Sequence, residues 1–427
     1  MKIFRSVNST REPPFVGMTS IILIPSSIMI ILLYGMIRLQ SNLEMDHAVE
    51  IKGIDTVTSR RNINMGNYSH LFSTFPLGSL RLPNRSVLSP MTRTSAEPSG
   101  LANERMARYY TRFAKGGFGL IITEGLYPDA ISSQSYENQP GLANEAQAES
   151  WRPVVRAVQS AGGKIVAQLM HAGALVQHDG FTPIAPSAVK PVGTMLEDHG
   201  GSGAFAVPRA MTQEDIRIVI GSFAQAALRA KKVGFDGVEV HAANGYLLDQ
   251  FITDYTNRRT DEYGGPTERR IRIVVEVLKV IRAAVGPDFV VGVRISQGKV
   301  NDFHHKWAGG ETDARIIFEH LAAAAPDYIH TTEYKAFAPA FSEGGPTLAK
   351  LAKQYSALPV IANGKLGQPD KAESLLENDH ADLVAIGTSA LVNPDWVNKV
   401  RVGMELHPFD HHFLQPIATL KEEEVGV

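Results

Sequence analysis

Three polar side chains follow one apolar run near the middle of the chain. The stretch 235–251 reads FDGVEVHAANGYLLDQF, which places His241, Asn244 and Tyr246 within six positions. His and Asn can both donate a hydrogen bond to one carbonyl or anionic oxygen, and a nearby Tyr hydroxyl can deliver a proton. The alternative is structural, with Asn244 and Gly245 shaping a turn while His241 and Tyr246 pack inside the protein. Because one segment holds all three, we favour chemistry at an oxygen atom.

A repeated strand–helix pattern must position these side chains. From residue 86 onward, short apolar runs alternate with polar loops and amphipathic stretches. Helical spacing of apolar residues predicts two of the intervening helices. The first stripe is Trp151, Val154, Val155 and Val158, and the second is Ile271, Val274, Val275, Leu278 and Ile281, closed by Gly286. The candidate strands are residues 87–92, 118–125, 164–170, 235–241, 288–295, 327–333, 359–364 and 381–387.

This alternation predicts an α/β fold, the (β/α)8 TIM barrel. Eight strand–helix units over about 310 residues match the size of such barrels. A doubly wound sheet is the competitor, but no Gly-rich dinucleotide fingerprint follows any early strand. Active sites in these barrels lie at the C-terminal ends of the strands. Polar residues at those ends are therefore candidates for chemistry.

Other strand ends carry groups suited to a flat ring and a phosphate. Thr92, Gln168 and Arg294 supply a hydroxyl, an amide and a permanent cation, which could frame a heteroaromatic ring that gathers negative charge. Alternatively, Arg294 pairs with a buried carboxylate such as Glu239. Arg294 could also do both, pairing with the carboxylate and contacting the ring. The last two strands end at Gly364 and Gly387. Because these residues have no side chain, backbone N–H groups there could approach a phosphate.

Several stretches together resemble the old yellow enzyme family of FMN-dependent NAD(P)H oxidoreductases. They are LSPMTRTSA, GLIITEG, AQLMHAG, VEVHAANGYLLDQFITDYTNRRTDEYGG, GVRIS, ANGKL and LVAIGTSALVNPDW. The resemblance covers residues of about 70 to 420 and is most specific in the longest stretch. It implies FMN at the barrel mouth, reduced by NADPH or NADH, and hydride transfer to the β-carbon of an α,β-unsaturated ketone or aldehyde.

The resemblance also implies roles for individual residues. His241 and Asn244 would hold the substrate's carbonyl oxygen, and Tyr246 would protonate the α-carbon. Thr388 stands where the family usually has a basic residue for the phosphate. The flavin-binding residues it implies are Pro90, Met91, Thr92, Gly125, Gln168, Arg294, Asn363, Gly364, Gly387 and Thr388.

Two other functions stay open. A non-flavin, phosphate-binding TIM-barrel enzyme would need a Schiff-base Lys or a general-base carboxylate at a strand end, and Lys365 is the only Lys at an expected strand end. A membrane-tethered flavin-binding protein with lost or altered turnover is suggested by residues 18–37 and by Thr388.

Composition and charge narrow the function classes. The chain has 427 residues, 44% of them hydrophobic, and a formal net charge of -2, which argues against nucleic acid as a partner. It contains no cysteine, so a thiolate metal site, a Cys-ligated iron–sulfur cluster and a Cys nucleophile are excluded. We expect no iron–sulfur domain of the kind that some family members carry. The expected partner is a small enone or enal, and the sequence does not specify an oligomeric state.

The first 64 residues differ from the rest. Residues 18–37 carry no charged side chain, and about 20 such residues can cross a bilayer as a helix. They are either a signal anchor or part of a non-native start, with Met65 as the functional start. We expect an extension at 1–64 and an FMN-binding barrel domain at 70–420. The expected location is cytoplasmic, with anchoring through 18–37 as the alternative.

Overall fold

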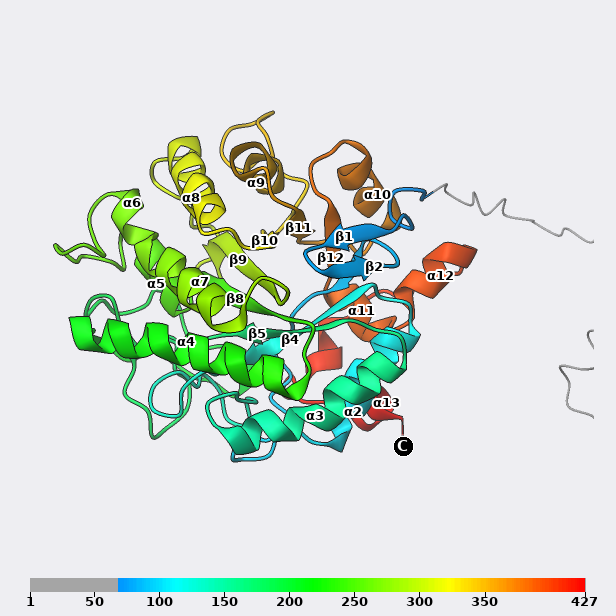
Figure 1. Cartoon of the computed structure of the whole chain (residues 1–427), viewed down its shortest axis with the longest axis horizontal. Coiled ribbons are helices and arrows are strands. Elements are labelled where there is room, and N and C mark those ends of the chain that lie inside the picture. Colours follow the sequence, from blue (N-terminus) through cyan, green and yellow to red (C-terminus); the bar gives the residue numbers. More distant parts are fainter. Residues whose placement is uncertain (1–67, 427) are drawn as a thin grey trace, which may run out of the picture. The chain divides into compact units, whose positions relative to one another are not determined.

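The computed structural model describes residues 68–426, and within them eight parallel strands close into a barrel (Figure 1). The neighbour order is β10-β11-β12-β3-β4-β5-β8-β9, closed on itself. The predicted (β/α)8 barrel is therefore confirmed. The strands are β3 Ser86–Leu88, β4 Leu120–Leu126, β5 Ile165–Leu169, β8 Gly237–Asn244, β9 Val290–Lys299, β10 Tyr328–Thr332, β11 Val360–Asn363 and β12 Leu383–Ile386.

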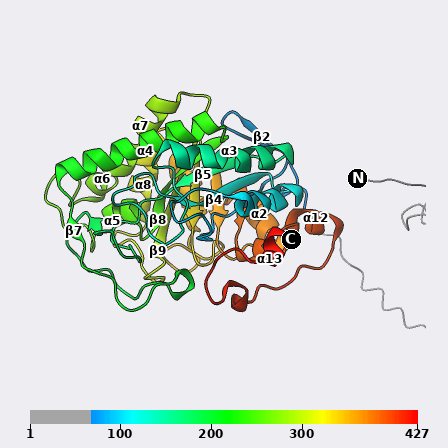
Figure 2. The same ribbon diagram turned by 90° about the horizontal axis from the view of Figure 1, so that it is seen from below.

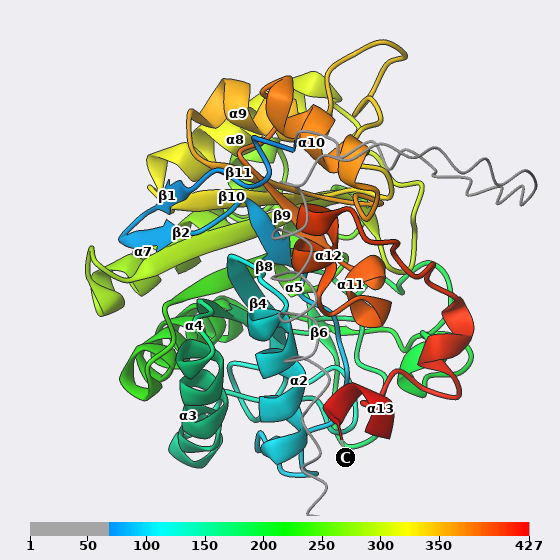
Figure 3. The same cartoon turned by 90° about the vertical axis from the view of Figure 1, so that its right-hand side faces the viewer.

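Helices lie outside the strands and cover the barrel (Figures 1 and 3). The longer ones are α2 Glu104–Lys115, α3 Glu145–Ser160, α4 Gln213–Val233, α7 Arg272–Val285, α8 Glu311–Ala323, α9 Leu348–Ser356 and α10 Pro369–Glu377. The shorter ones are α5 Leu247–Ile252, α6 Thr267–Arg270, α11 Thr388–Val392, α12 Trp396–Val402 and α13 Glu422–Val425. Short 3-10 turns lie at Glu197–His199 and His411–Leu414.

The apolar stripes explain how two of these helices pack. In α3, all four residues of the predicted stripe are buried, and Asn144 caps the helix by accepting from the Gln147 N–H at 2.9 Å. In α7, Val275 is only partly buried while Ile273 and Val277 are fully buried. The buried face of α7 is therefore displaced slightly from the predicted stripe. Gly286 ends the helix with φ of 78°, as predicted.

A short hairpin closes the N-terminal end of the barrel. Strands β1 Phe75–Leu77 and β2 Leu80–Leu82 pair antiparallel, and Leu77 and Leu82 are fully buried. They pack against buried residues of seven barrel strands, among them Val87, Val290 and Tyr328. This hairpin was not predicted from the sequence. Its consequence is that one end of the barrel is filled with apolar side chains, which leaves the opposite end for a site.

Strands β8 and β9 run further than the sequence predicts. The expected ends were residues 241 and 295, but the pairing continues with an irregular register to Asn244 and Lys299. Asn244 N–H donates to Ser296 Oγ at 2.8 Å, and Val300 N–H donates to the Asn244 carbonyl at 3.0 Å. These extra hydrogen bonds hold the predicted catalytic segment against β9. Its backbone is therefore more constrained than that of a loop without strand pairing.

The apolar segment 18–37 and Met65 lie outside the described residues. The expectation of a signal anchor or a non-native start therefore stays a prediction. Between residues 68 and 426, no helix combines the length and the apolar composition needed to cross a bilayer.

Candidate functional site

Two adjoining cavities open at the C-terminal ends of the barrel strands. One measures about 220 Å³ and the other about 960 Å³, and they share lining residues that include Met91, Asn244 and Arg294. Every residue predicted for the site lines one or both of them. These residues are Pro90, Met91, Thr92, Gly125, Gln168, His241, Asn244, Tyr246, Arg294, Asn363, Gly364, Gly387 and Thr388.

A buried carboxylate holds the loop that carries Thr92. Glu124 Oε2 accepts from the backbone N–H groups of Arg93 at 2.9 Å and Thr94 at 3.0 Å. Its other oxygen accepts from the Tyr110 hydroxyl at 3.2 Å. Burial raises the pKa of Glu124 to about 7, although the two backbone N–H groups act in the opposite direction. The loop after β3 is thus fixed from inside, and Thr92 is presented at the cavity wall.

A network inside the barrel orients Gln168. Its amide Nε2 donates to Glu239 Oε1 at 2.8 Å, while Tyr328 and His330 contact Glu239 Oε2 at 3.1 and 2.9 Å. Burial by itself would raise the pKa of Glu239, but His330 above all outweighs burial and the pKa is lowered. With its amide nitrogen engaged, Gln168 keeps its amide oxygen for a partner in the cavity.

Arg294 is a buried cation without a carboxylate partner among the described residues. Its side chain donates through Nη2 to Thr332 Oγ1 at 3.2 Å and Asn363 Oδ1 at 3.0 Å, and its buried Nε has no partner there. Burial lowers the pKa of Arg294 to about 10, so the guanidinium stays charged at neutral pH. The alternative pairing with Glu239 is wrong as a direct contact, because the Glu239 oxygens contact Gln168, Tyr328 and His330 instead.

Asn363 positions Arg294 with its side chain. Its Oδ1 also accepts from Thr332 at 2.8 Å, and its Nδ2 donates to Ser89 Oγ at 2.7 Å and to the Ala385 carbonyl at 3.1 Å. These bonds tie the upper ends of five strands together. The amide oxygen and nitrogen of Asn363 are therefore already hydrogen-bonded within the protein. Asn363 could contribute to cofactor binding through its backbone and by holding Arg294 in position.

His241, Asn244 and Tyr246 meet in the smaller cavity, as predicted. Burial, followed by the charge of Arg294, keeps the pKa of His241 well below its usual value, so the imidazole is neutral, and its Nδ1 has no partner in the described part of the chain. The rings of His241 and Tyr246 lie 5.2 Å apart. Burial also raises the pKa of Tyr246 well above 10, so its hydroxyl keeps its proton. Asn244 and Gly245 have φ of 62° and 87°, and this turn aims the segment into the cavity.

The wider cavity ends at the last two strands. Gly364 has φ of 137°, and a Cβ there would lie 2.0 Å from the Glu333 carbonyl oxygen, so only Gly fits this position. Lys365 is exposed and donates to the Tyr334 hydroxyl at 2.7 Å. Gly387 precedes Thr388, the first residue of α11. This end offers backbone N–H groups, a hydroxyl and one cation to an anion.

Lys299 lies at a strand end that the sequence pattern did not predict. Lys299 ends β9 and forms a buried ion pair with Asp249 at 2.8 Å, with the two side chains 2% and 0% exposed. Asp249 also accepts from the Gly245 N–H at 2.6 Å. The expectation that Lys365 is the only strand-end Lys is therefore wrong, because β9 is longer than predicted. Because its ammonium group is paired with Asp249, Lys299 supports the turn and does not offer a free amine for Schiff-base chemistry.

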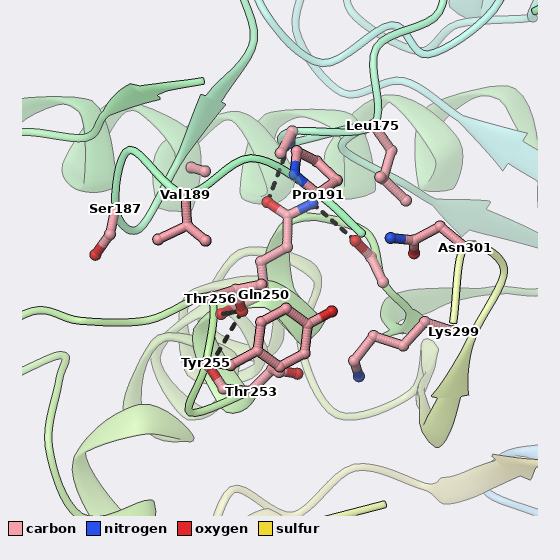
Figure 4. A pocket seen from close by; sticks show the side chains of 13 residues that line it. Leu175, Ser187, Val189, Pro191, Gln250, Thr253, Tyr255, Thr256, Lys299 and Asn301 are labelled. Carbon is pink, nitrogen blue, oxygen red and sulfur yellow. Dashed lines mark hydrogen bonds between the residues drawn. The ribbon is translucent and has the colours of Figure 1, made fainter. Parts of the chain in front are cut away.

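Gln250 supports the same turn from the other side (Figure 4). Its Nε2 donates to the Gly245 carbonyl at 2.7 Å, and its Oε1 accepts from the Ala174 N–H at 3.1 Å. Figure 4 shows Lys299 and Asn301 facing the small pocket that Gln250 and Tyr255 also line. The segment 244–246 is thus fixed by buried polar groups on both sides.

Other cavity residues come from segments without a recognisable sequence pattern. The wall contains Leu196, Asp198 and His199 from the region 175–212, and Leu414 and Ala418 from the C-terminal segment. Behind Tyr246, the Tyr136 hydroxyl lies 2.5 Å from the Tyr246 hydroxyl, 110 positions away in the sequence. Spacing cannot reveal such distant partners.

The residues present fit a planar flavin with a phosphate tail. Buried Arg294 Nε and His241 Nδ1 lack partners within residues 68–426, and buried polar groups normally have them. A cation, an amide and a hydroxyl line the shared cavity wall, and Gly364 allows the backbone to approach an anion. This donor set suits a ring with several acceptors that gains negative charge.

Comparison with known proteins agrees with this chemistry. Residues 70–407 match the family of NADH:flavin oxidoreductases and NADH oxidases. The NADH oxidase of Thermoanaerobacter brockii is 32% identical over 80% of this chain and 52% of its own length. The match to the metal reductase of Desulforamulus reducens covers 54% of that protein. This chain therefore spans about half the length of each of these two relatives. A probable flavin mononucleotide-dependent alkene reductase of Leishmania infantum is 33% identical over 78% of this chain and 91% of its own.

Solved structures share the fold over most of the described chain. The old yellow enzyme homologue of Zymomonas mobilis has a TM-score of 0.76 and 29% identity, covering 83% of this chain and 98% of its own. Morphinone reductase in complex with tetrahydroNAD has a TM-score of 0.71 and 34% identity, covering 81% and 93%. The chain therefore belongs to the NADH:flavin oxidoreductase / NADH oxidase family, the FMN-dependent oxidoreductases that include the old yellow enzymes.

Proposed function

We propose that this protein uses FMN and NADPH or NADH to reduce the activated C=C bond of α,β-unsaturated carbonyl compounds. One observation carries the proposal. Neutral His241, the Asn244 amide and protonated Tyr246 face the same cavity as Arg294 and Gln168. The relative described as a probable alkene reductase supports the reaction class, and the tetrahydroNAD complex of morphinone reductase supports a nicotinamide donor.

The cofactor would be held by groups from several strand ends. Bound there, FMN would supply the redox chemistry, the passage of a hydride from NAD(P)H to the β-carbon of the substrate. Arg294 would stabilise negative charge on the ring, the Gln168 amide would bind its polar edge, and Thr92 would donate from the β3 loop. Pro90, Met91 and Gly125 would line the ring. The phosphate would lie at Asn363, Gly364, Gly387 and Thr388.

The substrate's oxygen and its α-carbon need different groups. His241 and Asn244 would donate hydrogen bonds to the carbonyl oxygen, where negative charge grows during the reaction. Tyr246 would then transfer its hydroxyl proton to the α-carbon, which completes the addition of a hydride and a proton across C=C. Because the pKa of Tyr246 is well above 10, the proton stays on the phenol until the carbon becomes basic.

The cavity walls suit a small apolar skeleton. Met170, Leu196, Val300, Leu391 and Leu414 line the smaller cavity, whose volume is about 220 Å³. Such a site holds a cyclic enone or a short enal and gives few polar contacts beyond the carbonyl.

The half-reactions test the proposal directly. Purified full-length protein should be yellow, should bleach anaerobically with NADPH or NADH, and should regain its colour when a cyclic enone is added. A colourless protein that cannot be reconstituted with FMN would contradict the proposal. Bleaching without recovery on a panel of enones and enals would favour the alternative of a flavin-binding protein with altered turnover.

Replacing Tyr246 separates its role from that of the cofactor. Tyr246→Phe should leave bleaching by NADPH unchanged and slow the enone step by roughly 10²- to 10⁴-fold, the usual contribution of a general acid. Stopped-flow absorbance of both half-reactions measures this, with the first as the internal control. Equal loss in both half-reactions would mean that Tyr246 is not the proton donor.

We also infer the domain organisation. Residues 70–420 would form the FMN-binding unit and 1–64 an extension, and the family match over 70–407 supports this division. Membership of the family removes the non-flavin barrel enzyme as an alternative. Membrane tethering depends on residues 18–37, outside the described part.

A further inference from the structure

Tyr136 contacts Tyr246 from behind the cavity. The two hydroxyl oxygens lie 2.5 Å apart, and the side chains belong to residues that are 1% and 4% exposed. Tyr246 lines the smaller cavity, whereas Tyr136 is absent from its wall. The contact of the Tyr136 hydroxyl with the site is therefore the one it makes with the Tyr246 hydroxyl.

Tyr136 is surrounded by apolar side chains and by the His199 ring 4.7 Å away, an imidazole that stays neutral because burial lowers its pKa to about 4. Tyr136 packs in a cluster with Met170, Leu175, Phe205 and Tyr246. Ser135 Oγ, its polar neighbour in sequence, donates to the Leu175 carbonyl at 3.0 Å. Within residues 68–426, the only hydrogen bond of the Tyr136 hydroxyl is the one to Tyr246.

This environment determines which hydroxyl donates. Two hydroxyls share one hydrogen bond, and a buried O–H group without an acceptor costs free energy. Among residues 68–426, the Tyr246 oxygen is the acceptor within hydrogen-bond distance of the Tyr136 hydroxyl, while Tyr246 borders the cavity and can donate to a molecule in it. Donation from Tyr136 to Tyr246 is therefore the arrangement that satisfies both groups.

We propose that Tyr136 is a positioning residue that turns the Tyr246 proton toward the cavity and stabilises the phenolate left after proton transfer. The inference rests on the proposed function. In the transfer, the O–H bond of Tyr246 breaks and a C–H bond forms at the α-carbon of the substrate. The electron pair remains on the Tyr246 oxygen, which accepts the Tyr136 hydrogen bond until water in the cavity returns the proton.

The hydrogen bond matters because few other groups can stabilise this charge. Tyr246 is almost fully buried, and its cationic neighbour Arg294 is also required for charge on the flavin. Hydrogen bonds to charged groups contribute more than neutral ones. Loss of this bond should affect the protonation step and leave flavin reduction alone.

The test first compares two single variants of the FMN-loaded full chain with wild type. Tyr136→Phe removes the hydroxyl and keeps the ring. Tyr127→Phe is the matched control, because Tyr127 lies after the same strand and its hydroxyl binds Gln147 away from the cavity. We expect Tyr136→Phe to lower the limiting rate of flavin reoxidation by an enone about 10- to 100-fold. The enone concentration for half-maximal rate and the NADPH step should be unchanged, and Tyr127→Phe should resemble wild type.

A double variant distinguishes this role from a loss of packing. In a Tyr246→Phe background, Tyr136→Phe should slow the enone step no further, because there is no phenolate to stabilise. An equal fall in both backgrounds, or a normal rate in Tyr136→Phe alone, would overturn the inference. Wild-type protein that fails to reduce enones would instead refute the proposed function, and the inference with it.

Discussion

At the scale of single residues, burial decides which site groups carry charge. Burial disfavours the charged form, so it lowers the pKa of His241 and raises that of Tyr246, and both side chains are neutral. The same effect lowers the pKa of Arg294 only to about 10, which leaves the guanidinium charged. One environment thus yields a neutral hydrogen-bond donor, a protonated acid and a cation.

Glu124 should make the stability of the protein depend on pH. Burial raises its pKa from 4.5 to about 7, so between these pH values the folded protein binds a proton that the unfolded chain has released. The free energy of unfolding should therefore fall by about 3 kcal/mol as the pH rises through this window. Below pH 4.5 the contribution is fully present, and above pH 7 it is lost.

Urea unfolding of wild type and Glu124→Gln between pH 4 and 8 measures this effect. Gln keeps an acceptor for the backbone N–H groups of Arg93 and Thr94 but does not titrate. The stability difference between the two proteins should change across the window by the stated amount. Glu97→Gln is the control for the loss of one carboxylate in the same loop, since the Glu97 side chain is exposed. Parallel curves for Glu124→Gln and wild type would refute the prediction.

At the scale of elements, the long strands β8 and β9 build the reactive turn. Their pairing runs past His241 to Asn244 and Lys299. The pair Lys299–Asp249 and the side chain of Gln250 then fix the backbone at Gly245 from two sides. Chemistry at residues 241–246 therefore depends on polar groups buried beneath the turn.

Removing one member of this ion pair should be costly. Lys299→Met leaves the Asp249 carboxylate buried without its cation, and we expect a loss of about 3–5 kcal/mol in the free energy of unfolding. The double variant Lys299→Met with Asp249→Asn should recover part of that loss, because no uncompensated charge remains. Urea unfolding at neutral pH measures both.

A surface lysine provides the comparison for this prediction. Lys306 pairs with Glu333, but its side chain is 44% exposed, so Lys306→Met should cost at most about 1 kcal/mol. Equal losses for Lys299→Met and Lys306→Met would show that the buried pair has no special role.

At the scale of the whole molecule, the C-terminal segment crosses back over the barrel mouth. Leu414 and Ala418 line the smaller cavity, and α13 lies beside α2 (Figures 2 and 3). Glu424 of α13 forms buried ion pairs with Arg93 and with Arg112, the latter at 3.0 Å. Because Arg93 follows Thr92 directly, the end of the chain is connected to the loop that presents Thr92.

Cutting this connection should release the end of the chain. Glu424→Ala leaves Arg93 and Arg112 buried without their carboxylate, and we expect a loss of about 3–5 kcal/mol in stability. Limited proteolysis should then remove the C-terminal residues faster than in wild type. Glu422→Ala is the matched control, since the Glu422 side chain is 65% exposed in its pair with Arg105. Unchanged proteolysis of Glu424→Ala would contradict the proposed connection.

Much of the site could be predicted from the sequence because its residues lie at strand ends. Short apolar runs predicted eight strands and helical spacing predicted two of the helices between them, and the barrel brings the strand ends together whatever the loop details. His241, Asn244 and Tyr246, with Gln168 and Arg294, therefore meet as expected. The ends themselves were less accurate, since pairing between β8 and β9 continues through polar residues that carry no apolar pattern.

What the sequence by itself determined is the barrel, the family resemblance and the identity of the residues at its mouth. Only the tertiary structure decided which buried partner each of them has. Glu239 pairs with His330 and leaves Arg294 without a carboxylate, Lys299 pairs with Asp249, and Tyr136 meets Tyr246. These partners lie on different strands and loops, and their pairing follows from distance and burial in the closed barrel, which spacing along the chain does not encode.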